Sequence, residues 1–283
     1  RRETRLQKAR VDTRNAQTMC KSKPVLTRHS SNLEGQDLPA GTLPADLDLK
    51  AATLKLFEFS YSMPSVKVRA LLKYYQVPYE SVATQPHQKR DEIDNSYGKV
   101  PKLLITSPVD VQINDSAVIV RTLAPLLTGG EALTPEQVEL EKLNNISGFL
   151  GALEKESFGS FYGIAGAVKH VTSAWRSKTA SAVVSYSAGL LWPVPYLMLK
   201  FAPMGKDGDS LTHAKVYRKA LGDDAFFHGK APGPLDISLY GSLACFLALG
   251  SPYANAALDR ADLRAWYDRT EKAYLEVVGA PLF

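Results

Sequence analysis

Alternation of apolar and polar side chains predicts strands in the first half of the chain. Residues 53–59, Thr-Leu-Lys-Leu-Phe-Glu-Phe, alternate as a strand does when one face is buried. Apolar positions over 62–75 then recur at helical spacing, with Ser62 available as the N-cap. A second helix is expected over 117–127, after the cap-forming residues Asn114, Asp115 and Ser116. Further short strands are expected at 79–83, 100–105 and 111–113.

The order of these elements is strand, helix, strand, polar segment, strand, strand, helix. A parallel strand-helix-strand unit, an antiparallel pair and a closing helix form the α/β plan of thioredoxin-like domains, with helices expected on both faces of the sheet. Beyond the Thr-Gly-Gly break at 128–130, apolar positions recur only at helical spacing. Helices are expected at 135–153, 162–186, 211–221, 235–249 and 263–278. The sequence thus predicts three parts: a basic arm with its connector at 1–50, a thioredoxin-like domain at 51–128 and an all-α domain at 135–283.

The composition is that of a globular protein and argues against several kinds of site. Of the 283 residues, 45% are apolar and 22% are charged, so the chain is neither fibrous nor wholly disordered. The two cysteines, Cys20 and Cys245, cannot form a dense disulfide framework, and a reducing compartment is expected. The five histidines neither cluster at metal spacing nor suggest a Ser/His/Asp grouping. We therefore expect no metal site and no hydrolase site.

The basic charge belongs to the N-terminal arm and not to the folded body. Residues 1–28 hold nine Lys or Arg against two acidic residues, whereas residues 29–283 hold 25 against 27. The chain starts at Arg1 without an initiator Met, and an Arg-rich, acid-poor N-terminus is typical of an organellar transit peptide or of the sequence behind its cleavage point. An artificial chain boundary is one alternative. A nucleic-acid-binding arm is another, but no aromatic residues are interleaved with the basic ones, and we expect no nucleic-acid partner.

One stretch is long enough in principle to cross a bilayer. Residues 179–199 form a run of 21 uncharged residues. Pro193 and Pro195 argue against a span, because prolines remove backbone donors that lipid could not replace. A buried helix followed by a proline-broken segment is expected instead. The alternative is that residues 190–199, which include Trp192 and Tyr196, contact a membrane surface or a partner protein.

A set of short motifs follows in a specific order along the chain. They are Ser-Met-Pro-Ser at 62–65, Val-Lys-Val-Arg-Ala at 66–70, Val-Pro-Tyr at 77–79, Lys-Val-Pro at 99–101, Ile-Asn-Asp-Ser-Ala-Val-Ile at 113–119 and Pro-Gly-Pro-Leu-Asp-Ile-Ser-Leu-Tyr-Gly at 232–241. In this order and spacing they resemble the motifs of the glutathione transferase superfamily, and most closely those of the membrane-associated prostaglandin E synthases of type two. The resemblance covers most of residues 51–128 and a patch near 222–267. It implies a thioredoxin-like α/β domain followed by an all-α glutathione-transferase-like domain.

The resemblance also implies a reactive thiol at the start of the first helix, which this chain lacks. A helix N-terminus lowers the pKa of a cysteine thiol placed there. Ser62 and Ser65 occupy both cysteine positions, so thiol–disulfide exchange is excluded. Phe59 stands where the family has a Tyr near the reacting sulfur, and Ser60 stands where it has a Lys facing the glycine carboxylate of glutathione. The catalytic positions Ser62, Ser65 and Phe59 are therefore interpreted as degenerate.

Other glutathione-contacting positions of the family are present. The resemblance implies that Ser62 could hold a glutathione thiolate by a hydrogen bond. It also implies that Val100, before a cis-Pro101, pairs with the tripeptide, and that Asp115 and Ser116 receive its γ-glutamyl end. A purely structural interpretation stands beside this one. In it, Ser62 is a helix N-cap, Pro101 maintains the fold and Ser116 caps the next helix. Asp236 is expected to be a capping-box carboxylate and not a catalytic group.

Two functions follow as hypotheses. In the first, the protein is a catalytically degenerate accessory subunit of a mitochondrial membrane complex, with the respiratory chain as the leading candidate, and needs no cofactor. It would lie peripheral to the inner membrane, with the arm 1–50 extended across a partner subunit because the arm cannot bury enough apolar surface to order itself. The segment 190–199 would be a second contact. In the alternative, the protein is a glutathione-dependent transferase or isomerase that uses Ser62 to hold the thiolate of bound glutathione.

Overall fold

The computed structural model describes most of the two domains that the sequence predicts. It describes residues 29–30, 36–39, 41–60, 62–158, 184, 187 and 209–283. The basic residues 1–28 and the segment 190–199 lie outside the described residues, so the partner contacts expected of them stay predictions. Of the uncharged stretch 179–199, only positions 184 and 187 are described. None of the helices within the described residues combines the length and apolar character that a bilayer crossing requires.

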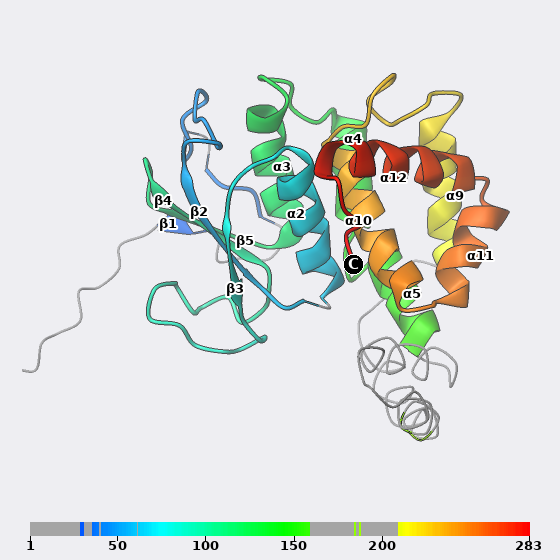
Figure 1. Cartoon of the computed structure of the whole chain (residues 1–283), viewed down its shortest axis with the longest axis horizontal. Coiled ribbons are helices and arrows are strands. Elements are labelled where there is room, and N and C mark those ends of the chain that lie inside the picture. Colours follow the sequence, from blue (N-terminus) through cyan, green and yellow to red (C-terminus); the bar gives the residue numbers. More distant parts are fainter. Residues whose placement is uncertain are drawn as a thin grey trace, which may run out of the picture.

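The first domain is built on a mixed five-stranded sheet (Figure 1). Its strands are β1 (His29–Ser30), β2 (Thr53–Glu58), β3 (Glu80–Ala83), β4 (Lys102–Ser107) and β5 (Val111–Asn114). The strand order is β1-β5-β4-β2-β3, with β2 parallel to β3 and antiparallel to β4, and β4 antiparallel to β5. This pairing confirms the predicted thioredoxin-like plan. The short β1 adds a parallel partner to β5 that the hydrophobic pattern did not predict.

Both helices of this domain lie on the same face of the sheet. They are α2 (Met63–Tyr74) and α3 (Ser116–Leu127), and their apolar residues share one buried cluster with Leu54 and Leu56 of β2. Successive residues of a strand point to opposite faces, so Phe57 packs on the other side, against Leu104 and Ile93. The expectation of helices on both faces is therefore wrong. The polar segment 85–98, which contains Ile93 and no helix, lies over the second face.

The connector belongs to the folded body and not to the arm, which corrects the predicted boundary at residue 51. Leu47 and Leu49 are only 7% and 3% exposed and join the same apolar cluster as α2 and α3. Further along the connector, Asp37 forms an ion pair with Arg121 of α3 at 2.8 Å. Sequence periodicity could not predict the burial of Leu47 and Leu49, because they lie in a loop and are buried by contacts with residues distant in the sequence. The expected extended arm is thereby limited to residues before β1.

The second domain is helical in all of its described elements. It contains α4 (Pro135–Leu143), α5 (Phe149–Phe158), α9 (Ser210–Leu221), α10 (Pro234–Ala248), α11 (Pro252–Arg260) and α12 (Arg264–Val278). The helix expected over 135–153 is divided into α4 and α5. The Asn145 side chain accepts hydrogen bonds from the amides of Ser147 and Gly148, which favours a turn at this point. A Cβ at Gly148 would also collide with the Leu143 carbonyl oxygen, so the close turn needs glycine.

Close packing of α10 against α2 joins the two domains, as Figure 1 shows at the centre of the molecule. The first 13 residues of α10, Pro234–Phe246, are all buried. Gly241 lies where the backbones approach, because a Cβ built there would be 2.8 Å from the Cβ of Ala70 and 3.1 Å from the Cα of Lys67. Any larger residue would force the two helices apart. The relative position of the domains therefore depends on the absence of a side chain at Gly241.

We expect Gly241→Ala to lower the free energy of unfolding by about 1–3 kcal/mol, because the added methyl overpacks the α2–α10 contact. The matched test adds Ala70→Gly, which removes the nearest obstructing methyl. Ala70→Gly alone should cost about 1 kcal/mol through helix propensity. The double variant should be destabilised by less than the sum of the two single changes, measured by urea denaturation. Strict additivity would show that the contact at Gly241 is not the constraint described here.

Candidate functional site

A cavity of about 560 Å³ lies between the start of α2 and the helical domain. Its wall includes four of the five positions that the sequence predicts for glutathione binding, namely Ser62, Val100, Asp115 and Ser116. The fifth, Pro101, follows Val100 through a cis peptide bond and is buried. The far side of the cavity comes from the α4–α5 loop and from α5. Residues more than fifty positions apart in the sequence thus meet in one site.

Ser62 and Ser65, which occupy the two cysteine positions, have different surroundings. Ser62 is the N-cap residue of α2, as predicted, but its side chain makes no capping hydrogen bond and lines the cavity. Ser65 is fully buried away from the cavity wall, and its hydroxyl has no hydrogen-bond partner among the described residues. Phe59 also lines the cavity and is 41% exposed. Of the three positions interpreted as degenerate, only Ser62 presents a hydroxyl to a ligand.

Asp115, and not Ser116, caps helix α3, which corrects the structural interpretation of Ser116. The Asp115 carboxylate accepts hydrogen bonds through Oδ1 from the amides of Ala117 and Val118, at 2.8 and 3.3 Å. Ser116 is the first residue of the helix and is 5% exposed. Both residues contribute to the cavity wall. The N-terminus of α3 therefore lies at the cavity, and two of its amides already donate hydrogen bonds to the Asp115 carboxylate.

The cavity wall also carries charge of both signs. Lys99, Arg121 and Lys142 provide cationic groups, and Asp115 and Glu154 provide carboxyl groups. Arg121 is paired with Asp37, with an Nε to Oδ1 distance of 2.9 Å. Lys142 pairs with the exposed Glu139 at 2.8 Å. The cavity wall therefore has cationic groups that could pair with the carboxylates of a ligand, and carboxyl groups that could pair with its ammonium group.

Residues 56–126 match the family model described as "Glutathione S-transferase, N-terminal domain". These residues are a glutathione transferase N-terminal domain. Prostaglandin E synthase 2 of Danio rerio is 38% identical over 78 residues, which cover 28% of this chain and 19% of that protein. Prostaglandin E synthase 2 of Mus musculus is 34% identical over 100 residues, which cover 35% of this chain and 26% of that protein. These matches show a likeness to the glutathione transferase superfamily and to prostaglandin E synthase 2, and they span only about a fifth to a quarter of those relatives.

Solved glutathione transferases match the chain at greater coverage and lower identity. A glutathione S-transferase-I with bound lactoylglutathione is 16% identical, has a TM-score of 0.48 and covers 81% of this chain and 99% of its own. A theta-class glutathione S-transferase of Xanthomonas axonopodis pv. citri with bound glutathione is 17% identical and has a TM-score of 0.46. The match covers 81% of this chain and 99% of that protein. The likeness to this family rests on the sequence matches and the sheet topology. The matched domain has a cis peptide bond at Val100–Pro101 and serine at positions 62 and 65.

Glu154 is a site residue of this glutathione transferase-like protein that the sequence analysis missed. It lies on α5, one helical turn after the buried Leu150 and one turn before Phe158, and it lines the cavity. Burial raises the pKa of its carboxyl to about 7. The sequence signal would have been a single acidic residue at helical spacing between two apolar ones. Such a pattern places a carboxyl group on the apolar face of a helix.

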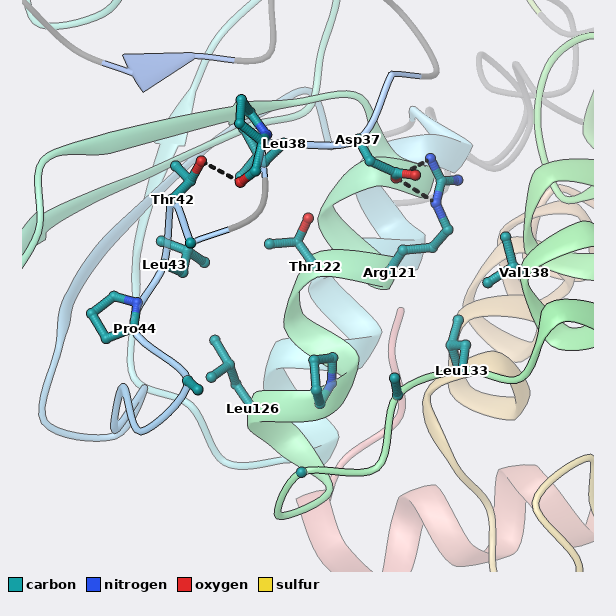
Figure 2. Close-up of a pocket in the computed structure, with 16 residues that line it drawn as sticks. Asp37, Leu38, Thr42, Leu43, Pro44, Arg121, Thr122, Leu126, Leu133 and Val138 are labelled. Carbon is teal, nitrogen blue, oxygen red and sulfur yellow. Dashed lines mark hydrogen bonds and ion pairs between the residues drawn. The ribbon is translucent and has the colours of Figure 1, made fainter.

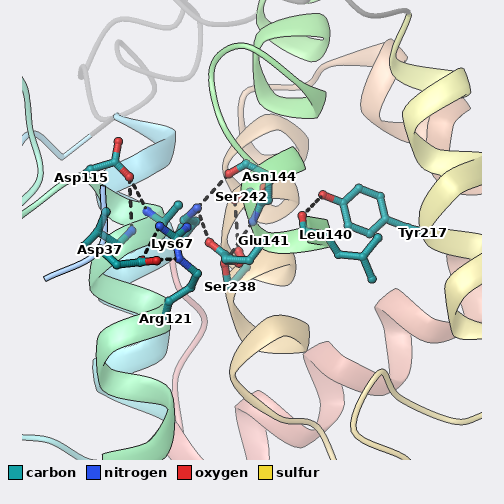
Figure 3. A network of polar contacts seen from close by, with 12 residues as sticks. Asp37, Lys67, Asp115, Arg121, Leu140, Glu141, Asn144, Tyr217, Ser238 and Ser242 are labelled. Carbon is teal, nitrogen blue, oxygen red and sulfur yellow. Dashed lines mark hydrogen bonds and ion pairs between the residues drawn. The ribbon is translucent and has the colours of Figure 1, made fainter. Parts of the chain in front are cut away.

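A buried ion pair joins α2 to α4 close to the loop that lines the cavity (Figure 3). Lys67 of α2 and Glu141 of α4 are fully buried, with 2.5 Å between Nζ and Oε1. Lys67 also donates a hydrogen bond of 2.8 Å to the Asn144 carbonyl, immediately before the loop that lines the cavity. Ser238 of α10 donates to the other Glu141 oxygen at 2.7 Å and accepts from the Asn144 amide at 3.0 Å. One network thus ties α2, α4, α10 and the cavity loop together.

Asp236 has the structural role expected of it. Its carboxylate accepts hydrogen bonds from the amides of Gly233 and Phe227 and from the indole of Trp266, at 3.0, 2.9 and 2.8 Å. It also lies 3.1 Å from Nδ1 of His228. Four contacts on one buried carboxylate hold the start of α10 in place. Asp236 is therefore a capping and anchoring residue and is not part of the cavity wall.

Cys245 is a free, buried thiol on α10, and burial raises its pKa to about 12, so it cannot replace the missing motif thiols. Cys20 and His170 lie outside the described residues. Within the described part of the chain, no three His, Cys, Asp or Glu side chains come together as a metal site would require.

A second cavity, of about 500 Å³, lies on the other side of α3 (Figure 2). The connector forms one wall through Leu38 and Leu43, and α3 forms another through Thr122 and Leu126. Arg121 borders both cavities, and its ion pair with Asp37 lies between them. This second cavity is a consequence of the connector packing on the body.

We expect Lys67→Met to lower the free energy of unfolding by about 3–5 kcal/mol at neutral pH, because it leaves the Glu141 carboxylate buried without its cation. Burial already raises the pKa of Glu141 and Lys67 opposes that effect, so the variant should take up a proton at Glu141. A carboxyl whose pKa is raised in the folded state favours folding at low pH, so the deficit should shrink as pH falls. Adding Glu141→Leu should restore most of the stability, measured by urea denaturation. A double variant as unstable as the sum of both single changes would contradict the pairing.

Proposed function

We propose that the interdomain cavity binds glutathione, or a thiol of the same γ-glutamyl class, as a transferase or isomerase site without thiol–disulfide exchange. One observation carries the proposal. Four positions predicted to bind glutathione, Ser62, Val100, Asp115 and Ser116, line a single cavity. Of these positions, Ser62 lines the cavity with a hydroxyl that makes no capping hydrogen bond to α2.

The local chemistry supports thiolate binding at Ser62. A hydroxyl at the first turn of a helix can donate a hydrogen bond to a thiolate, and the positive end of the helix dipole favours the anion. Because the Ser62 side chain does not cap α2, donation to a ligand would break no hydrogen bond that the helix needs. Thiol–disulfide exchange stays excluded, because a hydroxyl cannot form a disulfide and the Cys245 thiol is buried. The reaction left to the site is one in which the thiolate comes from the ligand.

The charged ends of glutathione also have partners in the cavity wall. Both capping bonds of Asp115 use Oδ1, so Oδ2 can accept from the ammonium group of a γ-glutamyl end. The family's carboxylate-binding Lys is replaced by Ser60, but Lys142 reaches the same cavity from the helical domain. We infer that Lys142 takes over part of this role. An ammonium group on a flexible side chain can exchange its surface partner Glu139 for a ligand carboxylate at little cost.

We expect Ser62→Ala to weaken glutathione binding by about ten- to a hundredfold, because it removes a charge-assisted hydrogen bond worth about 1.5–3 kcal/mol. Thermal stability should change little, since no capping bond is lost. Ser65→Ala is the matched control. It removes a buried hydroxyl one turn along the same helix, away from the cavity, and should leave binding unchanged. Titration calorimetry of the whole protein measures glutathione binding by the wild type and both variants, and scanning calorimetry measures their thermal stability. Absence of saturable binding to the wild type at millimolar glutathione would refute the proposal.

A second candidate function is supported by the lost thiols and the basic arm. Serine at 62 and 65, Phe59 and Ser60 remove the family's usual reactive groups, as expected of a subunit kept for its shape. The charge of the arm is confined to residues 1–28, outside the body. We propose, as the alternative, an accessory subunit of a mitochondrial membrane complex such as a respiratory-chain complex. The protein would lie peripheral to the inner membrane and bind a partner subunit through this arm and through residues 190–199.

The two candidates differ in the assembly state of the native protein. If it is an accessory subunit, the full chain should migrate within a large assembly in native electrophoresis of solubilised mitochondria. Deleting residues 1–28 should release it as a free protein with an unchanged melting temperature, because the deletion spares the connector residues Leu47 and Leu49. Migration of the full chain as a monomer or dimer would sink the subunit proposal. It would leave glutathione binding standing.

A further inference from the structure

Glu154 is an ionisable residue of the cavity wall whose carboxyl group has no structural role in the fold. Glu154 projects from α5 into the cavity wall on the side formed by the helical domain, whereas Ser62 belongs to the wall formed by the thioredoxin-like domain. No hydrogen bond or ion pair joins the Glu154 carboxyl to any described residue. Its neighbours one turn away, Leu150 and Phe158, are apolar. A partly buried carboxyl in such surroundings destabilises the fold in its charged form.

The other ionisable groups near Glu154 lie on its own helix, on α10 and in the cavity wall. On its own helix, Lys155 is exposed, and Glu156 accepts hydrogen bonds from Ser210 at the start of α9. On α10, Cys245 is buried, and Glu154 helps to raise its pKa. The remaining ionisable groups of the cavity wall are Lys99, Asp115, Arg121 and Lys142. Burial, and not one of these charges, raises the pKa of Glu154 to about 7.

Asp115 and Phe59 are less suited to receive a proton from a ligand. Asp115 already accepts two amide hydrogen bonds at the start of α3, so its carboxylate serves as an anionic cap. Phe59 has no ionisable group. Among the carboxyl groups of the wall, Glu154 alone has no described hydrogen-bond partner. A base acts best when its pKa lies near the working pH, which Glu154 satisfies.

Resting on the proposed function, we propose that Glu154 is the proton acceptor for the thiol of a ligand bound in this cavity. In this step the S–H bond breaks, its electron pair stays on sulfur, and the proton is bound by a carboxylate oxygen of Glu154. Ser62 then donates a hydrogen bond to the thiolate. The protonated Glu154 returns its proton to water at the open side of the cavity, so the step needs no oxidant, reductant or metal.

The pH dependence follows from the sign of the transfer. Above about pH 7 Glu154 is a carboxylate and can accept the thiol proton, whereas below that pH it already carries one. The thiolate fraction of bound glutathione should therefore fall as the pH is lowered through 7. Glu154→Gln, which has nearly the same shape and cannot accept a proton, should remove this dependence.

The test uses the whole protein and two ligands. Bound thiolate is followed by its ultraviolet absorbance with glutathione, and binding is followed by calorimetry with S-methylglutathione, which has no thiol proton. We expect Glu154→Gln to reduce the thiolate signal at neutral pH by about tenfold or more, equivalent to one pKa unit or more. S-methylglutathione binding should stay within about twofold of wild type. Glu154→Asp should restore part of the thiolate signal, and Glu131→Gln, an exposed glutamate outside the cavity, should have no effect.

Each outcome separates this proposal from the one on which it rests. Failure of the wild type to bind S-methylglutathione would refute the proposed function itself. If both proteins bind it and the thiolate signal is unchanged in Glu154→Gln, ligand binding stands and the role of Glu154 is overturned. Loss of S-methylglutathione binding in Glu154→Gln would assign the residue to ligand positioning and would equally overturn its role as proton acceptor.

Discussion

The close approach of α10 to α2 at Gly241 is the constraint on which the two-domain structure depends. Because Gly241 has no Cβ, the backbone of α10 lies against Ala70 and Lys67 at van der Waals distance. This approach puts Lys67 deep in the interface, where its ammonium group meets Glu141. The start of α2, with Ser62, is thereby fixed in position relative to α4 and α5. The cavity between the domains is a product of this packing and not of either domain alone.

The buried ion pair is better understood as a device for specificity than as a source of stability. Removing two charges from water costs several kcal/mol for each ion, and their mutual attraction repays this only when the geometry is good and the remaining polar atoms are satisfied. Here Ser238 and the Asn144 carbonyl supply those additional hydrogen bonds. A slipped arrangement of the domains would leave both charges buried and separated. The pair therefore favours one domain arrangement, and through Asn144 it fixes the loop that forms part of the cavity wall.

How far the sequence predicts this protein depends on whether an element is determined locally. The strands and the two helices of the sheet domain follow from period-two and helical patterns, and Ser62, Val100, Asp115 and Ser116 were found because they lie in ordered motifs. The connector was misassigned because Leu47 and Leu49 are buried only by contacts with distant elements. The break between α4 and α5 depends on Asn145 and Gly148 in one turn. Glu154 was missed because its position in the site depends on the packing of the two domains.

The presence of serine and not cysteine at the start of α2 determines which partner must supply the nucleophile in the proposed site. A protein thiol at this position can react by itself, whereas the hydroxyl of Ser62 can only stabilise an anion brought by a ligand. The thiol pKa of such a ligand lies above neutral pH, so a hydrogen bond alone leaves much of it protonated. A base within the same cavity removes this deficiency, and the helical domain supplies one at Glu154. In the proposed site, the groups that bind and deprotonate the thiol are therefore divided between the two domains, which makes their fixed arrangement a requirement for the proposed activity.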